Sequence, residues 1–80
     1  YVQPNPVLNE ARFMFASETF TLGNTASIKI YNLMGQEVET ISNFSETNNS
    51  FERGNLQGGL YFAQLISEEN ILATTKLVLR

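Results

Sequence analysis

Eighty residues are enough for one small domain, and a content of 42% hydrophobic and 16% charged residues is ordinary for a globular protein. The chain has no Cys, His or Trp, which excludes disulfides, Ser-His-Asp triads, thiolate nucleophiles and Cys/His zinc sites. All eight acidic residues are Glu, and with five Lys and Arg they give a net charge of −3. This balance argues against binding a nucleic acid backbone by bulk charge, and we expect no metal ion and no cofactor.

The two ends of the chain favour one part of a longer protein. The sequence begins at Tyr1, without an initiator Met, a basic segment or an apolar leader. No apolar run, Leu60–Ala63 among them, approaches the ~20 residues that a membrane-spanning helix needs. We therefore expect a soluble piece of a larger chain, in which residues 1–7 are a linker and first-strand lead-in and residues 8–80 are the folded domain.

The N-terminal stretch Gln3-Pro4-Asn5-Pro6 is predicted to be extended. Each proline fixes its own φ and pushes the preceding residue toward β or polyproline II. The stretch is either a semi-rigid linker or the signature of a domain boundary. Two β-like runs follow, Arg12–Phe15 and Thr19–Leu22, and the second of them ends at Gly23-Asn24.

The clearest alternation of apolar and polar residues lies in Ala26–Tyr31. It predicts a strand whose inward side chains are Ala26, Ile28 and Ile30. The next residues, Asn32–Gly35, are predicted as a turn in which Gly35 takes a positive φ.

Gln36–Ile41 predicts a further strand, with Glu37 and Glu39 on the face opposite Val38 and Thr40. The last residue of this run breaks the alternation, so the strand has either a bulge or an early end. Two carboxylates on one face, with α-carbons about 6.5–7 Å apart, approach the spacing of a glycosidase pair. A solvated outer face is the favoured interpretation, because nothing in the sequence indicates a cleft.

The second half of the chain predicts three strands. Ser50–Glu52 is short, and an Asn55–Gly59 turn with an apolar anchor precedes Leu60–Ser67, which is apolar on both faces and is predicted to be covered on both. Glu68-Glu69-Asn70 forms a tight connection, with Asn70 as the candidate for the left-handed conformation. A last strand over Ile71–Arg80 directs four side chains outward: Thr74, Lys76, Val78 and Arg80.

No segment has the 3.6-residue apolar period of an amphipathic helix. The spacing of about 8–12 residues between strands is typical of an all-β sandwich or barrel. We therefore predict an all-β fold, an immunoglobulin-like antiparallel β-sandwich of about seven short strands.

Two further patterns have an ordinary and a functional interpretation. Gly58-Gly59 lacks the Lys-Ser/Thr or helix start of a phosphate loop, so it indicates a turn with an unusual φ, and we expect a positive φ or a close backbone contact at Gly59. Four aromatic residues are either core residues or a stacking platform for a sugar: Tyr31, Phe44, Phe51 and Tyr61.

Three segments together carry a resemblance to a known family. They are Pro4-Asn5-Pro6, the run Ile28–Val38 around the Asn32–Gly35 turn, and a closing part made of Gly59-Leu60-Tyr61-Phe62 and Lys76–Arg80. In this order the segments resemble the type A C-terminal sorting domains of the type IX secretion system of Bacteroidetes. The resemblance covers essentially the whole chain.

This resemblance implies a delivery signal and not an enzyme. Such a domain follows a larger cargo protein that enters the periplasm by its own signal peptide. The type IX translocon and its shuttle proteins then recognise the domain, and a sortase-like peptidase usually removes it at the cell surface. The localisation expected is export, with transit through the periplasm to the surface or the medium.

The resemblance implies a set of recognition residues, namely Pro4, Asn5, Pro6, Gly35, Gly59, Tyr61, Lys76, Val78 and Arg80. The edge of the terminal strand is a candidate docking site, because unpaired N–H and C=O groups accept a partner strand. An ordinary strand with solvent-facing Lys and Arg fits the same pattern. The alternative function is a carbohydrate-binding or adhesive β-sandwich module of a secreted hydrolase.

Overall fold

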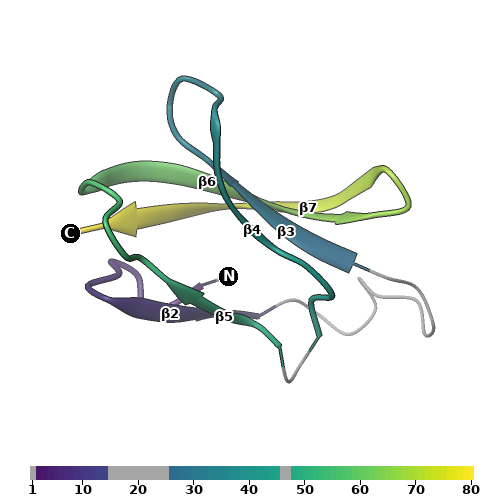
Figure 1. Cartoon of the computed structure of the whole chain (residues 1–80), viewed down its shortest axis with the longest axis horizontal. Helices are drawn as coiled ribbons and strands as arrows, with labels where there is room; N and C mark the ends of the chain where they lie inside the picture. Colours follow the sequence, from purple (N-terminus) through teal and green to yellow (C-terminus); the bar gives the residue numbers. More distant parts are fainter. Residues whose placement is uncertain (1, 15–25, 46–47) are drawn as a thin grey trace.

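The computed structural model describes residues 2–14, 26–45 and 48–80, which form two antiparallel sheets stacked in two layers (Figure 1). The smaller sheet has the order β1-β2-β5 and consists of β1 (Val2–Gln3), β2 (Glu10–Phe13) and β5 (Ser50–Glu52). The larger sheet has the order β4-β3-β6-β7 and consists of β3 (Ala26–Tyr31), β4 (Glu37–Ile41), β6 (Gly59–Ser67) and β7 (Asn70–Leu79).

The described residues thus confirm the predicted antiparallel sandwich of seven short strands. The two-residue strand β1 was not expected, because Val2–Gln3 is too short to show an alternation. The predicted strand Thr19–Leu22, the Gly23-Asn24 turn and Phe15 lie outside the described residues. No helix that could cross a membrane occurs in the described part of the chain.

The core lies between the two sheets, and inward side chains alternate with outward ones along β2, β3 and β6. In the smaller sheet the rings of Phe13 and Phe51 meet edge to face, with centroids 6.1 Å apart. The larger sheet contributes aliphatic side chains from its inner face: Ala26, Ile28, Ile30, Ala63, Leu65, Leu77 and Leu79. The inward assignment of Ala26, Ile28 and Ile30 is therefore confirmed.

Strand β6 is covered on one face only, so the expectation of two covered faces was wrong. Tyr61, Ala63 and Leu65 are buried, whereas Phe62 and Ile66 on the opposite face remain half-buried. The reason is the number of layers, because a two-sheet sandwich gives each strand a single inner face. Phe62 and Ile66 lie instead on the outer surface of the larger sheet.

Two local expectations about the backbone also need correction. In the β6–β7 connection the positive φ angles fall on Glu68 (51°) and Glu69 (68°), and not on Asn70. Ser67 pairs with Asn70, so Glu68 and Glu69 are the two central residues of the hairpin loop, and positive φ at both is the pattern of a type I′ turn. Asn70 is already the first residue of β7. The stretch Gln3–Pro6 bends at Pro4, Asn5 and Pro6 and is not extended, and both of its X-Pro peptide bonds are cis.

The difference between the two faces of β6 gives a test of the fold. Leu65→Ala removes a side chain that is 0% exposed and should lower the free energy of unfolding by about 2–5 kcal/mol. Phe62→Ala removes a larger but half-buried side chain and should cost about 1 kcal/mol. Chemical denaturation of the two variants measures both values. A larger loss of unfolding free energy for Phe62→Ala than for Leu65→Ala would contradict the assignment of the inner face of β6.

Candidate functional site

The N-terminal Pro-Asn-Pro motif lies against the C-terminal end of β7. The Val78 amide donates a hydrogen bond to Asn5 Oδ1 (3.0 Å), and Asn5 Nδ2 donates to the Lys76 carbonyl (3.4 Å). The side-chain amide of Asn5 thus pairs with both a backbone N–H and a backbone C=O group on the outer edge of β7. This is the pair of hydrogen bonds that a neighbouring strand would otherwise supply.

Val7 continues this contact with its own backbone. Its amide donates to the Val78 carbonyl (2.7 Å), and its carbonyl accepts from the Arg80 amide (2.9 Å). These bonds form a short parallel bridge with Leu79, and the Val7 side chain is completely buried. We call the contacts between residues 5–7 and residues 76–80 the end clasp.

The end clasp limits which part of the β7 edge can pair with another strand. From the Lys76 carbonyl onward the outward N–H and C=O groups already have partners within the chain, so another strand could pair there only by displacing residues 5–7. No described residue pairs with the outer edge of β7 before Lys76. The division of the chain at residue 8 stays a prediction, although Val2 and Val7 are both part of the core.

The side chain of Arg53 forms hydrogen bonds in the same region. Its Nε donates to the Leu56 carbonyl (2.9 Å), and its Nη1 donates to the carbonyls of Leu8 (3.1 Å) and Arg80. The Arg53 backbone amide also donates to the Asn9 carbonyl (2.8 Å). A planar guanidinium with several fixed donors suits this role, because it joins three chain segments at one point.

Glycine is needed at Gly58 and at Gly59 for different reasons. A side chain at Gly58 would meet the Arg80 carbonyl carbon and the Leu79 carbonyl oxygen, each at 3.2 Å, so this position permits close approach to the end of β7. Gly59 has a φ of +145°, which confirms the expected positive φ at this position. The Tyr61 hydroxyl donates to the Gln57 carbonyl (2.7 Å) and fixes the turn that precedes β6.

The structure brings some of the proposed recognition residues together and separates others. Asn5, Pro6, Lys76, Val78 and Arg80 belong to the end clasp, and Pro4 directly precedes it. The side chain of Lys76 is exposed there, and Val78 is 36% exposed. The outward direction predicted for Lys76 and Val78 is therefore confirmed. Tyr61 is a buried core residue, and Gly35 (φ +82°, as expected) lies in the separate β3–β4 turn.

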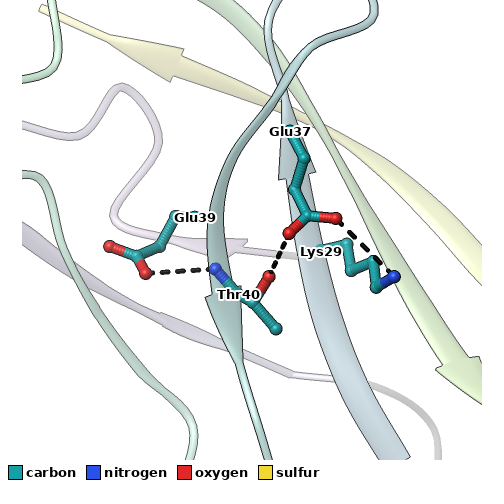
Figure 2. A network of polar contacts seen from close by, with 4 residues as sticks. All are labelled: Lys29, Glu37, Glu39 and Thr40. Carbon is teal, nitrogen blue, oxygen red and sulfur yellow. Dashed lines mark hydrogen bonds and ion pairs between the residues drawn. The ribbon is translucent and has the colours of Figure 1, made fainter.

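The two glutamates of β4 do not form a pair of catalytic carboxylates. The register places Glu37 opposite Tyr31 and Glu39 opposite Ile30, so Val38 is the extra residue of a bulge. Figure 2 shows that the two carboxylates consequently point to different sides of β4. The expectation that Glu37 and Glu39 share a face was wrong. Of the two alternatives for this strand, a bulge or an early end, the structure has the bulge, and it lies at Val38 and not at Ile41.

Each of these carboxylates has local partners. Glu37 lies 3.6 Å from Lys29 Nζ and accepts a hydrogen bond from Thr40 Oγ1 (2.7 Å), while Glu39 accepts from the Thr40 amide (3.0 Å) (Figure 2). The side chains of Lys29 and Glu37 are 40% and 45% exposed, so the ion pair adds little stability. The contacts fix the bulged edge of the sheet.

The aromatic residues considered as a sugar platform do not lie together on the surface. Phe44, Phe51 and Tyr61 are buried in the core, and only Tyr31 faces outward. Among the described residues, no three His, Cys, Asp or Glu side chains gather where they could hold a metal ion. Within the described part of the chain, these residues therefore form neither the sugar platform considered from the sequence nor a metal site.

Sequence reasoning missed Arg53 and Gly58, both of which contact the end of β7. The Arg53 side chain reaches carbonyls 45 and 27 positions away, and no local pattern signals such distant partners. The Gly58-Gly59 pair offered a signal, because two adjacent glycines often meet two separate requirements, one for space and one for φ. The side-chain pairing of Asn5 was equally invisible, since its partners lie 71 and 73 positions away.

The end clasp predicts a specific stability loss for Asn5→Ala. This variant removes both side-chain hydrogen bonds to β7 and should lower the free energy of unfolding by about 1–2 kcal/mol. Asn9→Ala, at an exposed position nearby, is the matched control and should change it by less than about 0.5 kcal/mol. Equal effects in chemical denaturation would show that Asn5 does not hold the strand edge.

Arg53→Lys tests whether the geometry of the guanidinium matters beyond its charge. Lysine keeps the charge but loses the fixed set of donors, so we expect a loss of about 1–2 kcal/mol in unfolding free energy. The control is Arg12→Lys at an exposed position of β2, with an expected change within about 0.5 kcal/mol. An unchanged unfolding midpoint for Arg53→Lys would show that the fixed donors of the guanidinium do not stabilise this site.

Comparisons with known proteins agree with the resemblance in the sequence. A search of curated proteins found no match. The family model of the secretion system C-terminal sorting domain matches residues 1–80, which is the full length of the chain. With the Pro-Asn-Pro motif, the Asn32–Gly35 turn and the basic-apolar ending all in place, the chain belongs to the C-terminal sorting domains of the type IX secretion system.

Proposed function

We propose that this domain directs a larger cargo protein across the outer membrane through the type IX secretion system, and that it has no enzymatic activity of its own. The observation that carries the proposal is the match of the sorting-domain family over residues 1–80. In this function the cargo precedes Tyr1. It passes through the periplasm, and it ends at the cell surface or in the medium after a sortase-like peptidase removes the domain.

The recognition surface proposed here is the exposed side of the end clasp. Lys76, Val78 and Arg80 lie on or directly after the terminal strand, and the chain on which they lie carries a net charge of −3. Lys76 and Arg80 therefore make a locally positive surface on a domain whose net charge is negative. Such a surface favours an acidic partner and orients the domain toward it. The translocon or a shuttle protein of the system is the partner in this proposal.

The side chains of this proposed surface can be changed without breaking the hydrogen bonds that hold the fold together. The backbone groups of Val78 and Arg80 are the ones that bind Asn5 and Val7, so changes to the side chains of Lys76 and Arg80 leave those hydrogen bonds in place. Lys76 and Arg80 are both exposed, so we expect each substitution to alter the free energy of unfolding by less than about 0.5 kcal/mol.

The test is an export assay in a bacterium with a type IX system. Residues 1–80 are fused behind a reporter that carries a signal peptide, and the reporter is measured in the periplasm, on the cell surface and in the medium. The wild-type fusion should leave the cell. Lys76→Glu with Arg80→Glu should stay folded yet remain in the periplasm, because the surface charge is reversed.

Arg12→Glu on the smaller sheet is the control for charge reversal and should be exported like the wild type. Normal export of the folded Lys76→Glu, Arg80→Glu variant would contradict the recognition surface and leave the sorting role intact. Retention of the wild-type fusion in the periplasm would contradict the sorting role itself.

A further inference from the structure

A second surface lies at the β3–β4 turn, away from the end clasp. Leu33 and Met34 in this turn are 67% and 81% exposed, more than any other large hydrophobic residue in the described part of the chain. Turns normally favour small or polar residues, for which exposure costs nothing. In Figure 1 the turn projects beyond the body of the sandwich, at the end of the β3–β4 hairpin. We call Leu33 and Met34 the apolar tip.

The apolar tip is held in one backbone conformation. Asn32 Oδ1 accepts hydrogen bonds from the amides of Met34 (2.9 Å) and Gln36 (3.0 Å), and Asn32 Nδ2 donates to Gln36 Oε1 (2.9 Å). Backbone bonds from Asn32 to the Gln36 carbonyl and from Gly35 to the Asn32 carbonyl, both 3.0 Å, close the turn. A fixed turn loses little conformational entropy on binding, so its two apolar side chains are ready to enter a pocket.

The charge around the tip decides between a membrane and a protein as the binding partner. The strand that follows the turn, β4, carries Glu37 and Glu39 and no Lys or Arg. On strands β3 and β4 as the structure describes them, the single cation is Lys29, and it is paired with Glu37. Segments that bind anionic membranes combine apolar and basic residues, so this acidic surrounding disfavours a lipid surface.

We propose that Leu33 and Met34 insert into an apolar pocket with a basic rim on a protein of the export machinery. This inference rests on the sorting function proposed above and adds a second contact to it. The pocket takes the two side chains, and its basic rim faces β4, on which Glu37 and Glu39 point to different sides. The tip and the end clasp then hold the domain at two separate places, which fixes its orientation on the partner.

The experiment uses the same reporter fusion with Leu33→Ser and Met34→Ser together. Both side chains are largely exposed, so the melting temperature should not change, while the exported fraction should fall at least about tenfold. Leu33→Met with Met34→Leu keeps the tip apolar and should restore export. Ile71→Ser, which removes a side chain that is 58% exposed in another hairpin, is the matched control and should be exported normally.

Each result separates the tip from the rest of the proposal. Normal export of Leu33→Ser, Met34→Ser, with the wild-type fusion also exported, overturns the role of the tip but not the sorting function. Failure of the wild-type fusion overturns both. If the double variant does not fold, Met34→Ser alone decides in the same assay, because it leaves Leu33 and all Asn32 hydrogen bonds unchanged.

A flotation assay tests the membrane as the alternative partner. Purified domain is mixed with vesicles of phosphatidylethanolamine and phosphatidylglycerol. The proposal predicts that the wild-type domain stays in the soluble fraction. Flotation that is lost in Leu33→Ser, Met34→Ser would assign the tip to a lipid surface and overturn the protein pocket.

Discussion

The outer edge of β7 is the constraint on which the structure depends, because the backbone groups of an edge strand need partners. Asn5 and Val7 supply those partners for Lys76, Val78 and Arg80. The same residues follow β1 of the smaller sheet, so one set of contacts closes an edge and joins the two layers. Val7 and Leu79 are both buried at this junction, which adds apolar packing to the hydrogen bonds.

The end clasp also explains why the motifs at the two ends of this family's sequence belong together. Asn5 of the Pro-Asn-Pro segment directly contacts Lys76 and Val78 of the terminal strand, 71 and 73 positions away in the sequence. A change in either segment therefore alters the stability of the other, and a loss of export after such a change does not by itself identify a recognition residue. Exposed side chains such as Lys76 are informative, because their backbone roles survive substitution.

Much of the fold could be predicted from the sequence, and the failures have physical causes. The bounds of Ala26–Tyr31 were right because its alternation is strict. The faces of β4 were wrong because one extra residue, Val38, shifts the register, and the broken alternation at Ile41 did not show where the extra residue lies. The second face of β6 was misjudged because apolar residues also occur on open surfaces. The contacts of Asn5 and Arg53 could not be predicted, since they depend on distant backbone groups.

Amide hydrogen exchange in the isolated domain tests the end clasp most directly. The Val78 and Arg80 amides donate to Asn5 and Val7, whereas the outward amide of Thr74 lies on the part of the β7 edge that no described residue covers. The account predicts slow exchange at Val78 and Arg80 and fast exchange at Thr74. Exchange at Val78 and Arg80 as fast as at Thr74 would show that the edge is open and would contradict the end clasp.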